Sequence, residues 1–459
     1  MKKVWDAEID VIVAGAGGCG LVSALAIAEK GFEVAVFEKT DRILGNTAAS
    51  AGMIPAAGTR FQREAGIYET ADEMTEDIQI KNNYESDQDI ILALCKESGP
   101  LVEWLADKLG IEMSLVNEFK YPGQRNKRMH APLSRSGLEL IKKLRAIAME
   151  NNLIHLLMRS EVNELVMNDN RVVGVKVLTL DGEQFIKGKK VILATNGFGA
   201  NQDLVQEHIP EIANAIYFGC ESNTGDALKM GEKVGAASES LGAYQGHSAV
   251  EESRGLLVTW GTIMMGGFMV NKEGRRFGNE AKGYSEFSVE LIRQTDQCGY
   301  IIFDQEIFRE LLTIEDFRNL NQNNAFIKSS TLEGLAEKIN VNINEFKNTT
   351  VTFQANKDGQ KDEYGRSNFP KKLKAPFIAV RVVPALFHTQ GGLKINKHAQ
   401  VLKKDGLPIP NLYAGGGAAV GVSGKSSYGY MSGNGLLSAL GFGKIAAEHA
   451  AKTLQKDPV

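Results

Sequence analysis

The sequence predicts an α/β protein in which a first domain is interrupted by a second, α+β domain. The chain begins with a strand, a glycine-rich turn, a helix and another strand. After residue 410 it again shows a strand, a glycine-rich stretch and a helix. Between these two regions, residues 240–375 break the pattern with polar, helix-like stretches. A length of 459 residues also favours two domains over one core.

The N-terminal β-α-β unit is typical of a dinucleotide-binding site. Residues 9–14 predict a buried strand, residues 15–20 match G-x-G-x-x-G, and residues 21–30 predict a helix. Residues 32–37 return to strand character and lead to Glu38. The glycines let the backbone approach a pyrophosphate at the helix N-terminus, and the carboxylate can accept hydrogen bonds from ribose hydroxyls. The contacts expected here are Gly15, Gly17, Gly18, Gly20 and Glu38.

The later parts of the chain extend this framework. Residues 171–180 and 184–194 are β-rich and are joined by an Asp-Gly turn, which predicts a hairpin. A glycine-rich stretch follows the second run, and residues 411–416 precede a helix that begins near Gly435. This order resembles the glutathione-reductase-like (Rossmann-type) FAD domain of the fumarate reductase and 3-ketosteroid dehydrogenase superfamily. The resemblance implies FAD rather than NAD, with the last helix directed at the flavin.

The resemblance carries further cofactor contacts onto this chain. They are Lys39, Asn46, Thr47, Ala51, Gly52, Val162, Ala194, Thr195, Gly197, Asn223, Gly225, Asp226, Gly392, Gly416, Gly435, Leu436 and Leu437. Asn46-Thr47 stands where succinate dehydrogenases carry the histidine that links FAD covalently, so we expect non-covalent FAD. Residues 223–226 read Asn-Thr-Gly-Asp and predict a helix N-cap by the side chain of Thr224 or Asp226.

The same resemblance implies a capping domain that closes over the flavin. The apolar run at residues 378–383 is expected to re-enter the FAD domain. The expected boundaries are residues 1–239 and 376–459 for the FAD domain and residues 240–375 for the capping domain.

Composition excludes several classes of partner. The net charge is −4 and no strong basic run is present, which argues against nucleic acid and anionic membranes. The four cysteines show no metal-binding or haem-binding spacing, so no metal site is expected. We expect no signal peptide and no transmembrane segment, and we expect the protein in the cytoplasm.

Two tyrosines bear on the substrate. Tyr284 lies four residues after Glu280, and Tyr430 directly precedes Met-Ser-Gly-Asn-Gly. Both positions resemble the substrate-clamping sites of the superfamily, where fumarate reductases carry arginine. A dicarboxylate needs fixed positive charge and bidentate donors, which tyrosine cannot supply. The pair therefore suits a neutral carbonyl substrate.

The resemblance also assigns roles to these residues. Ketosteroid dehydrogenases carry their proton-transferring tyrosine at the place of Tyr284. Tyr430 with Ser432 resembles the 3-oxo-5α-steroid Δ4-dehydrogenases and would polarise a ketone oxygen, at ~3 kcal/mol per donor. His388 stands where the family places a residue beside the flavin ring. The chain is shorter than typical steroid dehydrogenases, which leaves room for a smaller cyclic ketone.

We therefore expect an FAD enzyme that desaturates a cyclic ketone between its α- and β-carbons, or runs the reverse enone reduction. Its electron acceptor or donor is not identified. One alternative is a fumarate-type reductase of carboxylates that uses His388 with Arg125 or Arg128, near His130 at the expected active-site mouth. A second alternative is an electron-transfer flavoprotein subunit, which leaves the tyrosine pair without a role.

Overall fold

The structure is a computed structural model that describes residues 4–43, 45–118 and 120–456. An eight-stranded sheet has the order β19-β20-β9-β1-β2-β6, with β7 and β8 attached through β9. β1 lies inside the sheet, where Val13 pairs in parallel with Val36 and Ile192. The strands are β1 (Ala7–Ala14), β2 (Val34–Glu38), β6 (Ile154–Met158), β7 (Glu161–Asn168), β8 (Arg171–Thr179), β9 (Gly182–Leu193), β19 (Gln400–Leu402) and β20 (Pro408–Ala414).

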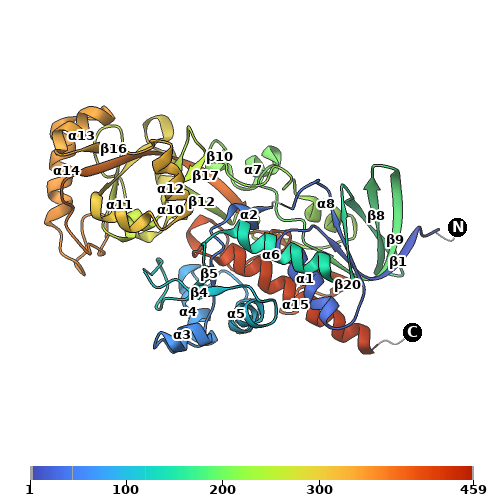
Figure 1. Ribbon diagram of the computed structural model, residues 1–459. Coiled ribbons are helices and arrows are strands. Elements are labelled where there is room, and N and C mark those ends of the chain that lie inside the picture. The colour runs from blue at the N-terminus through green and yellow to red at the C-terminus, as the bar shows by residue number, and fades with distance from the viewer. Residues whose placement is uncertain (1–3, 44, 119, 457–459) are drawn as a thin grey trace.

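Helices cover the eight-stranded sheet, and the first of them, α1, is itself buried. Helix α1 (Gly18–Glu29) packs against α15 (Asn434–Lys456) and α6 (Gly137–Glu150), and α15 also packs against α5 (Gln88–Asp107) (Figure 1). α1 is buried from Gly18 to Ala28, which explains why its sequence is apolar on every face.

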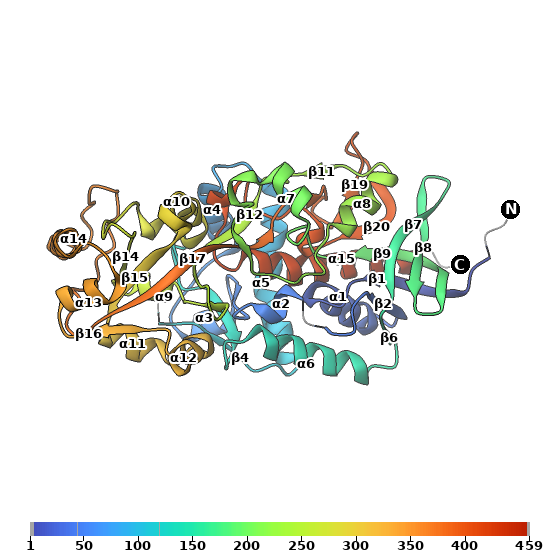
Figure 2. The same ribbon diagram turned by 90° about the horizontal axis from the view of Figure 1, so that it is seen from above.

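A second, seven-stranded sheet has the order β13-β12-β17-β15-β14, with β10 and β16 also paired to β17. Its strands are β10 (Ile216–Tyr217), β12 (Tyr244–Glu251), β13 (Leu256–Leu257), β14 (Phe268–Val270), β15 (Gly299–Asp304), β16 (Ile327–Ser329) and β17 (Phe377–Thr389). The helices around it are α9 (Gly261–Met264), α10 (Tyr284–Ile292), α11 (Gln305–Leu311), α12 (Glu315–Gln322), α13 (Leu332–Ile339) and α14 (Ile343–Ala355). Figure 2 shows this unit beside the first, with β17 running along it.

A third, smaller group of elements lies under the junction of the two sheets. The short sheet β3-β5-β4 packs with helices that lie between β3 and β4 in the chain (Figure 1). These elements are β3 (Ile54–Pro55), α3 (Arg60–Glu64), α4 (Ala71–Lys81), β4 (Met113–Leu115) and β5 (Met129–Pro132). The remaining short elements are α2 (Asn46–Ala49), α7 (Gln202–His208), α8 (Asp226–Lys233), β11 (Ser238–Glu239) and β18 (Gly392–Leu393).

The α/β class predicted from the sequence is confirmed. The predicted β-α-β start corresponds to β1, α1 and β2, and the predicted hairpin corresponds to β8 and β9, where Thr179 pairs with Gly182. The run at residues 378–383 differs from expectation, because its apolar side chains pack in the hydrophobic core of the second sheet. The predicted domain boundaries stay a prediction.

The N-cap predicted for α8 is wrong in its detail. Gly225 caps this helix with a φ of 82° and without any side-chain hydrogen bond. Thr224 and Asp226 are instead occupied by Lys39, whose Nζ lies 3.2 Å from the Thr224 Oγ1 and 2.6 Å from the Asp226 Oδ2. The side chains of this turn therefore bind Lys39 at the cavity wall instead of capping the helix.

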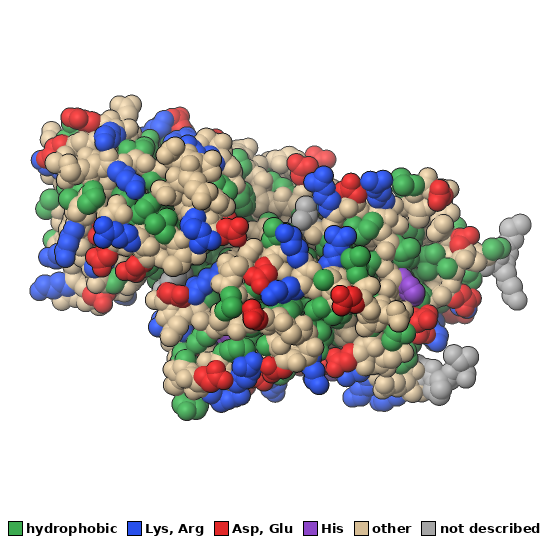
Figure 3. Space-filling view, viewed as in Figure 1, with side chains coloured by type: hydrophobic (Ala, Val, Ile, Leu, Met, Phe, Trp, Pro, Cys, Tyr) green, Lys and Arg blue, Asp and Glu red, His purple; other side chains and the backbone are tan. Residues whose placement is uncertain are grey.

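The surface carries charges of both signs. Lys and Arg side chains are interspersed with Asp and Glu over the face in Figure 3, without a large field of one sign. In the part of the chain that the structure describes, no helix has the length and hydrophobicity needed to cross a bilayer.

Candidate active site

One cavity of about 600 Å³ joins the two sheets and the small third group. Its wall includes the glycine turn before α1, the end of β2, the first turn of α15, and residues from β12, α10 and β17. Because the carboxyl ends of β1, β2 and β9 lie at one edge of the parallel sheet, their loops open into the same space.

The glycine turn forms a cradle at the edge of the first sheet. Gly15 has a φ of 105°, and a Cβ atom there would lie 2.4 Å from the carbonyl oxygen of Ala194. Gly17 precedes α1 without a side-chain cap, so the first N–H groups of the helix face the cavity. Glu38 accepts hydrogen bonds at 3.0 Å from the backbone N–H groups of Ala16 and Thr40. The arrangement suits a pyrophosphate with an adjoining ribose.

Asn46 ties several loops together at this wall. Its Oδ1 accepts from the backbone N–H of Cys220 at 2.8 Å and from the Asn223 Nδ2 at 3.0 Å. Its Nδ2 donates to the carbonyl oxygen of Phe387 at 3.2 Å. The side chain thus holds the end of β17 beside the loop before α8.

Most of the predicted cofactor contacts line the cavity. They are Gly15, Gly17, Gly18, Glu38, Lys39, Asn46, Thr47, Ala51, Val162, Ala194, Thr195, Asn223, Asp226, Gly416, Gly435 and Leu436. The Thr195 hydroxyl is buried on this wall and has no hydrogen-bond partner among the described residues, so it leaves room for a polar ligand atom. A dinucleotide cofactor fits these three features: the unpartnered Thr195 hydroxyl, the glycine cradle and the free N–H groups at the start of α1.

Six predicted contacts do not line the cavity. Gly20 and Gly197 are required by close packing, since a Cβ atom would lie 1.8 Å from the Gly15 carbonyl oxygen or 1.9 Å from the Thr389 Oγ1 respectively. Gly392 packs in the same way on residues 418–419. The others are the buried Leu437, Gly52, which packs on residues 136–137, and the N-cap Gly225.

The four predicted catalytic residues all line the cavity: Tyr284, Tyr430, Ser432 and His388. The rings of Tyr284 and Tyr430 are both buried, with centroids 6.1 Å apart and planes inclined by 56°. Burial raises the pKa of Tyr284 well above its ordinary value of 10, and the neighbouring Tyr430 raises it further. Burial also raises the pKa of Tyr430, which backbone N–H groups of Gly435 and Gly433 partly offset. Both phenols are therefore neutral donors at pH 7.

A buried ion-pair network holds the segment that carries Tyr284. The Glu280 carboxylate lies 2.7 Å from Arg276 and 3.2 Å from Arg366, with Glu280 and Arg366 fully buried. Burial alone would raise the pKa of Glu280, but the two arginines outweigh it and hold the pKa below its usual value. Gly283 then turns the chain with a φ of 132°, and α10 begins at Tyr284.

Two histidines flank the tyrosines, and only one was predicted. His247 stacks on Tyr284 with a centroid distance of 4.3 Å and on Phe387 at 5.0 Å. Burial lowers the pKa of His247 to about 3 and that of His388 to about 4. The Gln390 Nε2 lies 3.1 Å from the His388 Nδ1. Both imidazoles are thus uncharged at neutral pH.

Other cavity residues also escaped the sequence analysis. They are Met53, Tyr121, Met129, Gln245, Thr259, Trp260, Asp316, Phe387 and Gln390. Gln245 and His247 lie on β12, where Gln245 pairs with His388 of β17. The sequence carried no signal for them, because only the structure shows that β12 is buried along all eight residues although it contains Gln, His, Ser and Glu.

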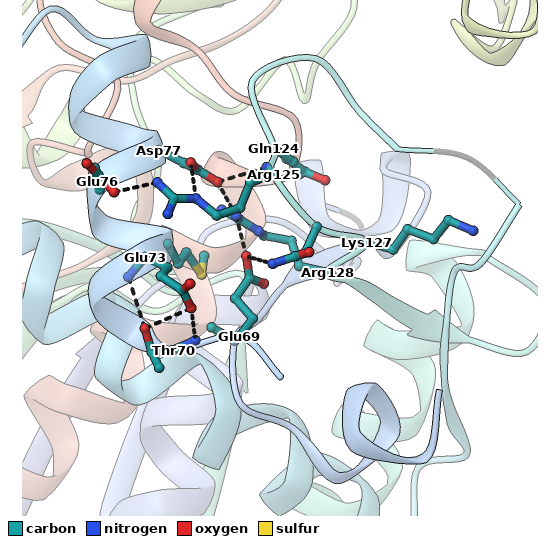
Figure 4. Close-up of polar contacts among 12 residues, drawn as sticks. Glu69, Thr70, Glu73, Glu76, Asp77, Gln124, Arg125, Lys127 and Arg128 are labelled. Atoms are coloured by element: carbon teal, nitrogen blue, oxygen red, sulfur yellow. Dashed lines mark hydrogen bonds and ion pairs between the residues drawn. The ribbon is translucent and has the colours of Figure 1, made fainter. Parts of the chain in front are cut away.

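The arginines of the carboxylate alternative do not line the cavity. Arg128 is fully buried and binds Glu69 at 2.5 Å and Asp77, as Figure 4 shows. Arg125 binds Asp77 at 2.7 Å and Glu76 at 2.5 Å in the same cluster. Their guanidinium groups are therefore committed to carboxylates of the protein.

His130 is also a structural residue. Its ring nitrogens lie 2.8 Å from the Thr59 Oγ1 and 2.9 Å from the carbonyl oxygen of Arg128, and it does not line the cavity. The expectation that it marks the active-site mouth is not supported by its position.

The charge of the cavity differs between its two ends. Among the described residues, the lysine and arginine side chains on the wall are Lys39 and Arg42, which follow Glu38 at the dinucleotide end. The second sheet and its helices contribute no lysine or arginine to the wall in the described ranges, but they contribute Asp316. Burial raises the pKa of Asp316, with Glu315 adding to the effect. The end that holds the tyrosines therefore offers no cation to an anionic substrate.

Comparison with known proteins identifies the cofactor class. Residues 10–436 match the family model described as FAD binding domain. The protein named probable fumarate reductase Ifc3 of Shewanella frigidimarina is 30% identical over 448 residues, which cover 96% of this chain and 74% of the relative. The chain belongs to the FAD-binding flavoprotein family that includes the fumarate reductases. It is thus an FAD-dependent oxidoreductase of the type that acts on CH–CH bonds.

Two solved structures of this flavoprotein family share the fold. The open conformation of a flavocytochrome c3 fumarate reductase gives a TM-score of 0.80 at 30% identity and covers 98% of this chain and 79% of that chain. The 3-ketosteroid Δ4-(5α)-dehydrogenase of Rhodococcus jostii RHA1 gives a TM-score of 0.78 at 23% identity and covers 98% of each chain.

Proposed function

We propose that this flavoprotein desaturates a neutral cyclic ketone between its α- and β-carbons, or reduces the corresponding enone. One observation carries the proposal: the cavity end that holds Tyr284 and Tyr430 has uncharged side chains and Asp316, but no lysine or arginine among the described residues. A carboxylate brought there would lose hydration without gaining a charged partner, which is costly. A ketone oxygen needs only hydrogen-bond donors.

In this proposal, different side chains bind the ketone and transfer the proton. The Tyr430 hydroxyl, with Ser432 beside it, would donate a hydrogen bond to the ketone oxygen and make the α-hydrogen more acidic. Tyr284 would take the α-proton as the hydride leaves the β-carbon. The FAD ring, when bound, supplies the two-electron acceptor for that hydride. His247 stacks against Tyr284, and Phe387 stacks against the His247 ring, which holds the Tyr284 ring in place.

The proposal also covers the cofactor linkage and the electron partner. Non-covalent FAD is supported by α2, because Asn46 and Thr47 line the cavity and neither is the histidine that links FAD in succinate dehydrogenases. The histidines on the described cavity wall are His247 and His388, both in the second sheet. The substrate is a small molecule, and a separate acceptor or donor must exchange electrons with the flavin.

The carboxylate alternative rests on the relatives, several of which are named fumarate reductases. It predicts that enoates bind better than enones. Arg125 and Arg128 would have to leave Asp77, Glu69 and Glu76 to serve it. Removing an arginine from a buried carboxylate partner is strongly unfavourable.

A matched pair of substrates tests the proposal. Reduced enzyme would be mixed anaerobically with 2-cyclohexenone or with 1-cyclohexene-1-carboxylate, which share a ring and differ in the polar group. Larger steroid enones and fumarate complete the panel. We expect flavin re-oxidation by neutral enones at far lower concentration than by any carboxylate. Efficient re-oxidation by fumarate or the cyclohexene carboxylate alone would overturn the proposal.

A further inference from the structure

The raised pKa of both tyrosines creates a problem for proton transfer. A neutral Tyr284 can accept the α-proton only if its own proton leaves at the same time. The large cavity is filled by substrate and cofactor during turnover, so the proton needs another exit. A second, small cavity also borders the tyrosine pair.

This small cavity has a volume of about 10 Å³. That is about the space that one water molecule needs. Its wall includes Tyr284, Tyr430 and Ser432, and on the other side Lys81 and Glu286. The same two phenols thus border both cavities.

Lys81 and Glu286 form an ion pair at the outer wall. Lys81 lies in the last turn of α4, and Glu286 lies in the first turn of α10, two residues after Tyr284. The Lys81 Nζ binds the Glu286 Oε1 and donates to the carbonyl oxygen of Lys282 at 3.1 Å. The side chains are 13% and 19% exposed, so the pair touches solvent on one side and the small cavity on the other.

We propose that Glu286, held in place by Lys81, is the proton port of the tyrosine pair. The inference rests on the proposed ketone chemistry. The α-C–H bond breaks and its electron pair enters the new C=C bond, while the hydride leaves the β-carbon for the flavin acceptor. The α-proton binds to the Tyr284 oxygen as the original phenol proton passes through the small cavity to the Glu286 carboxylate. From there it exchanges with solvent, and enone reduction uses the same groups in the opposite order.

The test measures the fate of the α-hydrogen rather than activity alone. FAD-loaded enzyme would be mixed anaerobically, in ordinary water, with a saturated ketone that carries deuterium at the α-carbon and that bleaches the flavin. The ratio of deuterium exchanged out of the unreacted ketone to flavin reduced is recorded, with the enzyme-free rate subtracted; the one hydron that each enone formed must release is not counted. We expect Glu286→Gln to lower this ratio roughly 10-fold or more, since label returns to the substrate when the port is closed. Glu286→Asp should retain most of the wild-type ratio.

A control variant and a chemical rescue complete the test. Glu97→Gln removes the acid of a comparably buried pair with Lys444, and neither residue lines either cavity. It should leave the ratio unchanged even if it lowers stability. Formate added to Glu286→Ala should restore the loss of label. A wild-type ratio in Glu286→Gln overturns the port alone, whereas failure of every ketone to bleach the wild-type flavin overturns the proposed function and the port together.

Discussion

At the tyrosine pair, the two hydroxyl groups differ in what surrounds them. Tyr430 has backbone N–H groups of Gly433 and Gly435 acting on its oxygen, whereas Tyr284 stacks on His247 and has the side chains of Ser432 and Tyr430 acting on its oxygen. The first environment favours a fixed hydrogen-bond donor to a ketone. The second favours a group that exchanges protons, because the groups that act on its oxygen are hydroxyls, which can themselves pass a proton.

Phenylalanine substitutions should separate these roles. Tyr284→Phe should leave FAD content intact and slow flavin reduction by roughly 10²–10⁴-fold, the usual contribution of a positioned acid or base. Tyr430→Phe should slow reduction and also weaken ketone binding, because its hydroxyl contacts the ground-state carbonyl. Stopped-flow bleaching over a range of ketone concentrations measures both effects. Reduction at the wild-type rate by Tyr284→Phe would remove Tyr284 from the mechanism.

The buried histidines predict a pH dependence of stability. Their pKa values of about 3 and about 4 in the folded protein lie below the ordinary value of 6.5. The unfolded chain therefore binds more protons, and stability that is present above pH 6.5 is lost as pH falls towards 4. His388→Gln should lose less stability than the wild type between pH 7 and pH 5, measured by urea unfolding. An identical decline in both proteins would contradict the assignment.

At the scale of elements, α10 is positioned by contacts before its first residue. Glu280 also accepts from the backbone N–H of Met269 at 3.2 Å, so the ion-pair network fastens the Tyr284 segment to β14. The adjacent Arg276 binds Asp362 at 2.7 Å. The segment that carries Tyr284 is thereby fixed to the core of the second sheet.

Breaking this network should lower the free energy of unfolding strongly. Glu280→Gln would leave two buried arginines short of a charge partner, and we expect a loss of about 3–5 kcal/mol in the free energy of unfolding. Glu345→Gln is the matched control, because Glu345 pairs with the exposed Arg275 at 2.8 Å. Its loss should be far smaller, because water screens this exposed pair. Denaturant unfolding of both variants measures the difference, and equal losses would refute the anchoring role.

The sequence predicted local elements well and non-local contacts poorly. The glycine turn, the hairpin at residues 181–182 and the last helix follow from neighbouring residues. His247 was missed because its place depends on the pairing of β12 with β17, about 140 residues later. Arg128 was misread because its partners Glu69 and Asp77 lie 59 and 51 residues away. Tyr284 and Tyr430 were placed through the family resemblance, which substitutes for such contact information.

On the scale of the whole molecule, FAD would contact loops from the first sheet, the third group and the second sheet. A ligand that binds only the folded state adds RT ln(1 + [L]/Kd) to stability. The cofactor is therefore expected to couple the unfolding of these parts.

Two measurements test the form in which FAD is bound. Acid precipitation should release all yellow colour into the supernatant, and colour retained in the pellet would show a covalent link. Removal of FAD under mild conditions should lower Tm, and added FAD should restore it in proportion to the logarithm of its concentration. Glu38→Ala should weaken FAD binding by about 1.5–3 kcal/mol, the contribution of a hydrogen bond to a charged group.

The close packing of Gly435 against His388 limits how these two positions can change in evolution. A Cβ atom on Gly435 would lie 2.4 Å from the His388 Cε1 and 2.5 Å from its Nε2. The imidazole therefore occupies the volume that any larger residue at position 435 would need. Positions 388 and 435 are expected to change together among descendants of a common ancestor. A lineage that replaces the histidine with a smaller side chain is free to accept alanine or serine at the start of α15, and one that keeps it is not.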